Sequence, residues 1–139
     1  MDSTGVSELV LQHHNAYVAG EHLDLRIQYP TKRHLLASWA IPRAIIPKKG
    51  ARILAVKTAD HGLKWLKFQG SIPRGVYGGG SVKIVQRCQV EIIKFTNSYI
   101  VFKTIGKTGP ISGKYSLIRM GQNKNKKQEA WFFMKNEDD

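Results

Sequence analysis

Short apolar segments separated by turn residues dominate the chain, and they constrain its fold more than any other feature. The segments are rich in Val, Ile, Tyr, Phe and Trp, recur at roughly 8–12 residue intervals, and are bounded by Gly, Pro, Asn or Lys clusters. The candidate strands are Glu8–His14, His22–Tyr29, Leu35–Ile41, Arg52–Thr58, Ser81–Cys88, Val90–Phe95, Ser98–Thr104, Lys114–Met120 and Ala130–Lys135. Crossover helices are missing from the pattern, which disfavours a parallel α/β architecture.

We therefore expect an all-β, mainly antiparallel fold, in the form of a small closed or nearly closed β-barrel of about eight strands. One or two short helices complete it, with His61–Phe68 as the candidate. No repeat or linker divides residues 1–139, so a single domain is expected. The glycines of Gly75–Gly80 predict tight backbone geometry, as at a bulged barrel corner, slightly more than a phosphate-binding loop.

The charge distribution indicates the sign of the partner. Residues 25–128 contain 21 of the 22 Lys and Arg residues against Asp60 and Glu91, whereas both ends of the chain are acidic; the net charge is +12. A basic stretch of this density is typical of a protein that binds a polyanion, most simply nucleic acid. The alternative is a protein from a generally basic organism or a neighbour of the ribosome.

Two further features bound the environment of the protein. Its single cysteine, Cys88, excludes an internal disulfide framework and a multi-thiolate zinc site. The apolar runs all fall short of the ~18 residues that a membrane helix needs. We expect a cytoplasmic, nucleoid-associated protein without membrane contact.

The segment from His22 to Tyr29 carries the strongest chemical signal. It alternates strictly, so His22, Asp24 and Arg26 share one face of a strand while the apolar residues share the other. An imidazole and a carboxylate two residues apart can converge on one cation, and an arginine one step further can hold a phosphate. An ordinary solvated polar face is the competing interpretation.

A third metal ligand is available one strand upstream. His13 and His14 can pair with His22 if the two segments form an antiparallel hairpin around Gly20. Two histidines and one carboxylate with open positions suit manganese, iron or zinc, and the residues alone do not choose among them. His61, next to Asp60, is a candidate proton donor or charged phosphate contact, or else a solvated residue at a helix start.

Several motifs, in order along nearly the whole chain, resemble the 3′-phosphoesterase domain of bacterial DNA ligase D, of which free-standing archaeal versions exist. The motifs are Gln12–Ala16 (QHHNA), His22–Arg26 (HLDLR), Ser38–Pro42 (SWAIP), Asp60–His61, Phe68–Gly78 (FQGSIPRGVYG), Ser112–Met120 and Trp131–Lys135. The resemblance implies a β-barrel enzyme that works with Mn²⁺. Its expected reactions are removal of a 3′-terminal ribonucleoside and then of the remaining 3′-phosphate from DNA primer strands, which leaves a 3′-hydroxyl.

The resemblance also implies roles for individual residues. His14, His22 and Asp24 match metal ligands, and Arg26 and His61 match residues that hold the scissile phosphate. Gln12, Arg43 and Arg52 are further candidates: Gln12 matches a glutamine near the metal, Arg43 stands where the family has a lysine, and Arg52 matches an essential arginine. We assign His61, Arg26 and Arg52 as catalytic, and Arg26, His61, Arg43, Arg52 and Gln12 as phosphate-binding.

Two departures from the family accompany these matches. Seven residues separate His14 from His22 where the family usually has five, and Trp65 replaces a tyrosine four residues after the phosphate-binding histidine. The expected partners are duplex primer–template 3′ ends and the ligase and polymerase of an end-joining system. The alternative function is a non-catalytic basic β-barrel that binds nucleic acid.

Overall fold

The computed structural model describes residues 4–76, 79–106, 109–121 and 128–136. Nine strands account for most of them. In chain order they are β1 (Gly5–Ala16), β2 (Gly20–Gln28), β3 (Leu35–Ile41), β4 (Arg52–Gly62), β5 (Gly70–Ile72), β6 (Gly80–Phe95), β7 (Tyr99–Thr104), β8 (Lys114–Arg119) and β9 (Glu129–Lys135). Between β4 and β5, one 3₁₀ turn, η1 (Leu63–Leu66), is the only helix in these described ranges.

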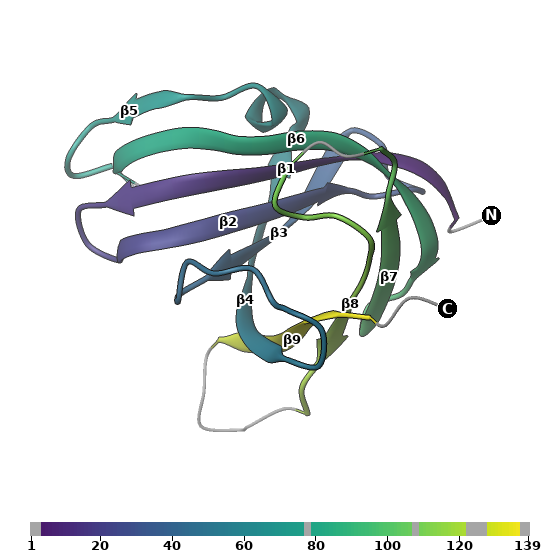
Figure 1. The fold of residues 1–139 in the computed structure, drawn as a ribbon. Helices are drawn as coiled ribbons and strands as arrows, with labels where there is room; N and C mark the ends of the chain where they lie inside the picture. Colours follow the sequence, from purple (N-terminus) through teal and green to yellow (C-terminus); the bar gives the residue numbers. More distant parts are fainter. Residues whose placement is uncertain (1–3, 77–78, 107–108, 122–127, 137–139) are drawn as a thin grey trace.

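The strands form one antiparallel sheet that closes into a ring (Figure 1). The order is β1-β2-β3-β4-β9-β8-β7-β6, and pairing of β6 with β1 completes the circle; β5 is added along β6. In Figure 1, β1, β2, β5 and β6 continue to the left of the ring as an extension of the sheet. The expected antiparallel all-β ring of about eight strands is confirmed.

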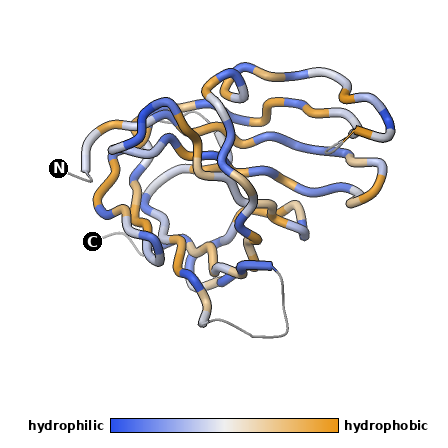
Figure 2. Tube along the Cα trace, turned by 180° about the vertical axis from the view of Figure 1, so that it is seen from behind, coloured by the Kyte–Doolittle hydropathy of each residue, from blue (hydrophilic) through white to orange (hydrophobic). Residues whose placement is uncertain are grey.

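Alternation of apolar and polar residues along the strands builds the core (Figure 2). One face of each strand points into the ring, where Trp39, Phe102, Tyr115, Trp131 and Phe133 are fully buried. Burying a large apolar side chain contributes roughly 1.5–3 kcal/mol, so this cluster supplies the main driving force for closure. A second, smaller cluster of Val10, Leu36 and Leu66 lies on the other face of the sheet, with Trp65 packed against it.

Two expected elements differ from the structure. The predicted strands Ser81–Cys88 and Val90–Phe95 are one continuous strand, β6, because β1 pairs with it from Gly80 to Ile92 without an intervening turn. Only Leu63–Leu66 of the predicted helical segment His61–Phe68 is helical, since His61 and Gly62 still belong to β4. None of the helices in the described part of the chain is long and apolar enough to cross a membrane.

Gly80 explains part of the glycine-rich segment, of which residues 77–78 lie outside the described ranges. Its φ is +139°, and a Cβ at this position would lie 2.2 Å from the backbone oxygen of Asn15. The close approach of β1 therefore requires glycine here. This is the tight backbone geometry that the sequence predicted.

Candidate active site

The hairpin of β1 and β2 assembles the polar cluster. His14 pairs with His22 and Gln12 with Asp24 in the antiparallel register, so their side chains lie on one face. The expected pairing of His14 with His22 is confirmed. The even difference of two residues from the family spacing leaves the facing of alternate side chains unchanged.

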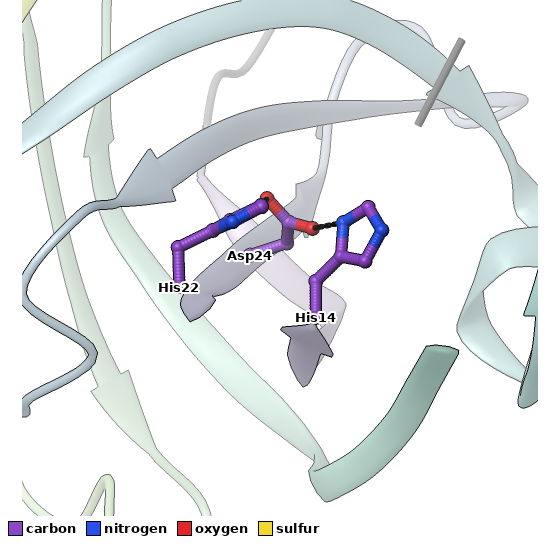
Figure 3. Close-up of side chains that lie close together, drawn as sticks. All are labelled: His14, His22 and Asp24. Atoms are coloured by element: carbon purple, nitrogen blue, oxygen red, sulfur yellow. Dashed lines mark hydrogen bonds and ion pairs between the residues drawn. The ribbon is translucent and has the colours of Figure 1, made fainter. Parts of the chain in front are cut away.

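His14, His22 and Asp24 converge around the Asp24 carboxylate (Figure 3). The Nδ1 of His14 lies 3.3 Å from Asp24 Oδ2, and the Nε2 of His22 lies 3.3 Å from Asp24 Oδ1. One potential ligand atom from each residue lies within 4.8 Å of the others, and all three residues are buried. Two imidazole nitrogens and a carboxylate oxygen form a donor set that first-row transition metals accept, so these residues fit a divalent ion.

The charges within this cluster are coupled. Burial alone would raise the pKa of the Asp24 carboxyl, but hydrogen bonds with His14 and His22 and the charge of Arg26 lower it well below its usual range. The pKa of His22 is raised, mainly by its hydrogen bond with Asp24 and against the effect of burial. The site therefore holds a carboxylate at neutral pH, and His22 competes for it with any metal ion.

Arg26 lies next to the cluster with its guanidinium almost fully enclosed. Its Nε donates to Gln12 Oε1 at 2.9 Å, one terminal nitrogen donates to Ser38 Oγ, and the other lies 3.5 Å from Asp24 Oδ2. The ring of Trp65 lies 5.0 Å from its Cζ. Arg26 is thus a fixed positive charge beneath the site.

The side-chain amide of Gln12 is engaged in contacts within the protein. It has no exposed surface, and its Nε2 donates to the backbone oxygens of Trp65 (2.8 Å) and Phe68 (3.1 Å). Both amide hydrogens are used by the protein, and the amide oxygen accepts from Arg26. Its surroundings therefore support a positioning role and do not support direct phosphate contact.

A β-bulge brings His61 to the same face. Ser38 pairs with Thr58 but Leu36 pairs with His61, so β4 contains one residue more than β3 over this interval. One extra residue in a strand moves the side chains that follow it to the opposite face of the sheet. His61 consequently meets Arg26, with Nδ1 3.3 Å from the guanidinium, while Asp60 turns to the opposite face and bonds Tyr29.

Arg26 and the backbone of Ala59 both approach the Nδ1 of His61, and the shorter contact, to Ala59, favours one tautomer. This Nδ1 lies 2.7 Å from the backbone oxygen of Ala59, which can only accept, so Nδ1 carries the proton and Nε2 is the acceptor in the neutral ring. Burial, and then the charge of Arg26, lower the pKa of His61. The ring also packs edge-on against Trp65 at 5.2 Å between centroids.

The structure does not bring the other two predicted arginines into the cluster. Arg43 is exposed in the turn after β3, two residues beyond Ile41, which pairs with Leu23 of the hairpin. Arg52 begins β4, nine residues before His61, and its guanidinium lies 5.0 Å from the centroid of the Phe132 ring. Arg43 is at the hairpin end of the sheet, whereas Arg52 is at the far end of β4. Their assignment to the phosphate stays a prediction.

Sequence reasoning missed Ser38 as a functional residue. It is fully buried and accepts a hydrogen bond from Arg26. Its position in the SWAIP motif, two residues from the apolar Leu36 and Ala40, gave no polar pattern from which this partner could be inferred.

The fold and the site define a small antiparallel β-ring protein with a candidate metal centre beside a buried arginine and a half-buried histidine. A family model described as the DNA ligase D 3′-phosphoesterase domain matches residues 12–131. The chain belongs to this family.

Named relatives are all much longer than this chain. It is 32% identical to the multifunctional non-homologous end joining protein LigD of Pseudomonas aeruginosa over 142 residues, which cover 99% of the chain and 16% of the relative. The protein of the same name from Mycobacterium bovis is 35% identical over 79% of the chain and 14% of its own length. That of Mycolicibacterium smegmatis is 31% identical over 81% and 15%. The chain thus spans only 14–16% of the length of these curated relatives.

Proposed function

We propose that this protein is a metal-dependent phosphoesterase that processes the 3′ ends of DNA strands during end-joining repair. The substrates are a 3′-phosphate and a 3′-terminal ribonucleoside, and the product is a 3′-hydroxyl. The observation that carries the proposal is the placement of His14, His22 and Asp24 next to Arg26 and His61 on one face of the sheet. Membership of the 3′-phosphoesterase family supports it.

Mn²⁺ is the proposed metal, and His14, His22 and Asp24 would hold it. When bound, a divalent ion supplies a Lewis acid that stabilises charge on a phosphoryl oxygen. The buried carboxylate of Asp24 provides the negative charge that favours a cation at this position.

Arg26 and His61 would act on the phosphate itself. Arg26 provides a fixed positive charge next to the site, and the enclosing hydrogen bonds avoid the cost of orienting it during the reaction. His61 presents Nε2, because Nδ1 is committed to Ala59. In the protonated state Nε2 can donate to a phosphoryl oxygen or to the leaving 3′-oxygen, and in the neutral state it can accept a proton from water.

The surface around the site would bind the DNA backbone. Lys64, Lys67, Arg74 and Lys83 are exposed on or between η1 and β6. Lysine and arginine contacts of this kind bind phosphates without reading sequence, and they weaken steeply as salt rises. We propose duplex primer–template ends as the macromolecular partner, and a DNA ligase and a polymerase of an end-joining system as functional partners.

A labelled duplex primer that carries either a 3′-phosphate or one terminal ribonucleotide tests the proposal. We expect conversion to a 3′-hydroxyl with Mn²⁺ and none in excess EDTA. The salt dependence of duplex binding is measured in parallel. Salt-sensitive binding without any conversion would instead support the alternative, a non-catalytic nucleic-acid-binding module.

A further inference from the structure

A cavity outside the candidate active site is lined by the last part of β4, the β6–β7 turn and the start of β9. Its volume is about 780 Å³, within the range of roughly 300–1,000 Å³ that is typical of small-ligand sites. Four aromatic side chains line it: Tyr29, Trp39, Phe95 and Trp131. Tyr29 and Phe95 are half-buried and lie 5.2 Å apart between ring centroids, so these two rings offer aromatic surface to the cavity, whereas Trp39 and Trp131 are buried.

The charged residues at the cavity are already paired with each other. Lys57 Nζ lies 3.3 Å from Asp60 Oδ1, and Arg119 Nε lies 3.5 Å from Glu129 Oε1. These four lining residues sum to zero charge, in contrast to the basic character of the rest of the chain. A phosphate or a carboxylate is therefore not the favoured occupant. The lining suits a neutral, planar group that carries both donors and acceptors.

The cavity and the candidate active site share one strand segment. Thr58, Ala59 and Asp60 line the cavity, and the next residue, His61, faces Arg26 because of the bulge in β4. The cavity and the candidate active site are therefore adjacent along β4.

We propose that this cavity binds an unpaired nucleobase of the strand whose 3′-phosphate occupies the active site. The half-buried rings of Tyr29 and Phe95 stack on the base, and the Asp60 and Glu129 carboxylates accept hydrogen bonds from its amino and imino groups. The inference rests on the proposed function, because the phosphate at Arg26 and His61 brings the base to the cavity.

The test compares two labelled single strands that carry a 3′-phosphate, one natural and one with abasic sites at the two nucleotides next to the phosphate. Binding is measured by fluorescence anisotropy in EDTA, which prevents turnover. We expect the unaltered protein to bind the natural strand about tenfold more tightly, the scale of stacking one base on an aromatic side chain. Removal of 3′-phosphate from a duplex primer with Mn²⁺ is assayed separately.

Three variants locate the effect. Ala59→Trp places a large side chain at an exposed lining position and should bring the ratio of the two affinities close to one. Ala51→Trp, at an exposed position before β4, is the matched control and should keep the ratio. Phe95→Leu retains apolar volume without an aromatic ring and should lower the ratio even if Ala59→Trp fails to fold.

The outcomes separate the two proposals. Equal binding of both strands by the unaltered protein, with 3′-phosphate removal intact, overturns the base site and leaves the proposed function in place. Base discrimination without phosphate removal overturns the proposed function only. Competition by free adenosine at micromolar concentration, without discrimination between the strands, assigns the cavity to a free nucleoside and overturns the strand-bound base.

Discussion

The side-chain amide of Gln12 fixes the guanidinium of Arg26 from behind. Its oxygen accepts from Arg26 Nε at 2.9 Å, while its nitrogen holds the backbone oxygens of Trp65 and Phe68. One buried amide therefore couples the arginine to the segment that covers it. The position of the Arg26 charge therefore depends on Gln12, a residue with no solvent-exposed surface.

Gln12→Ala tests this coupling. Loss of these buried hydrogen bonds should lower the free energy of unfolding by about 1–3 kcal/mol, and misplacement of Arg26 should slow 3′-phosphate removal about 10–100-fold. The affinity for Mn²⁺, measured by calorimetric titration, should change little. Ser38→Ala, which removes a single acceptor from Arg26, is the comparison and should be the milder variant. Loss of Mn²⁺ binding in Gln12→Ala would place Gln12 among the metal ligands.

Asp24→Ala should have the largest effect among the three candidate ligands, because it removes a ligand and the negative charge that His14, His22 and Arg26 share. Activity should be lost and Mn²⁺ binding should be undetectable by calorimetry. Undiminished 3′-phosphate removal by the unaltered protein in excess EDTA would contradict the metal site.

The apparent Mn²⁺ affinity should rise with pH. The pKa of His22 is raised above 6.5 by Asp24, so below that raised pKa a proton occupies the nitrogen that the metal needs. Affinity should increase as the pH rises through this pKa and level off above it. Titrations at several pH values check the sign, and an affinity independent of pH from 5 to about 8 would argue against His22 as a ligand.

His61→Ala should separate phosphate handling from metal binding. The imidazole contacts Arg26 and Ala59 and is not part of the three-residue cluster, so Mn²⁺ affinity should stay close to that of the unaltered protein. Activity should fall by ~10²-fold or more, the scale of a positioned acid, base or charge-stabilising group. Loss of Mn²⁺ binding in this variant would move His61 into the metal shell.

Between pH 5 and 7.5, His61→Gln should gain less stability with rising pH than the unaltered protein does. The pKa of His61 is lower in the folded state than the ordinary value near 6.5, so the unfolded state binds more protons between these two values. Stability from this residue is present above about pH 6.5 and is lost as the pH falls. Denaturant unfolding of both proteins at pH 5 and 7.5 measures the difference, and identical pH dependence would show that His61 is not buried as described.

The sequence was sufficient to predict the β1–β2 hairpin but not the β-bulge in β4. Strict alternation in β2 predicted the shared face of His22, Asp24 and Arg26, and the turn around Gly20 predicted the pairing with His14. The same rule of alternation places His61 and Thr58 on opposite faces, because they are three residues apart. Only the extra residue in β4 brings both to the side of Ser38, and no residue type marks that insertion.

The side-chain contacts of Gln12 and Arg52 could not be predicted from the sequence either. Whether a polar residue touches the substrate or another side chain depends on what covers it, and η1 with its flanking residues covers Gln12 from more than fifty positions away. The placement of Arg52 over Phe132 follows from the pairing of β4 with β9, which periodicity does not specify.

Gly80→Ala should destabilise the protein more than Gly5→Ala. Both glycines have similar φ values, +139° and +123°, but a Cβ at Gly5 meets nothing within 4 Å whereas one at Gly80 would clash with the backbone of Asn15. Gly5→Ala should cost about 1–2 kcal/mol from the backbone conformation alone, and Gly80→Ala about 3 kcal/mol or more. Thermal unfolding compares the stabilities of the two variants. Equal losses of stability would show that β1 shifts to accommodate the added Cβ at no cost in free energy.

Substitutions of Trp65 test whether the segment that covers Arg26 contributes only packing or also a hydrogen-bonding group to the site. The centroid of the Trp65 ring lies 5.0 Å from Arg26 Cζ. The ring centroids of His61 and Phe68 lie 5.2 and 4.7 Å from it. The indole has one N–H donor, whereas the tyrosine at this place in the family has a hydroxyl that both donates and accepts.

Trp65→Tyr should therefore keep the fold and leave 3′-phosphate removal equal or improved, because the smaller ring still covers Arg26 and adds a hydroxyl. Trp65→Phe is the matched control, since it has the same ring without the hydroxyl and isolates that group's effect. Trp65→Ala should lower the free energy of unfolding by about 2–4 kcal/mol through lost packing, and should reduce activity because Arg26 and His61 lose a common neighbour. Initial rates on a 3′-phosphate primer and denaturant unfolding give both quantities for each variant. A well-folded but inactive Trp65→Tyr protein would show that the indole itself, and not the aromatic cover that it shares with tyrosine, is needed at this position.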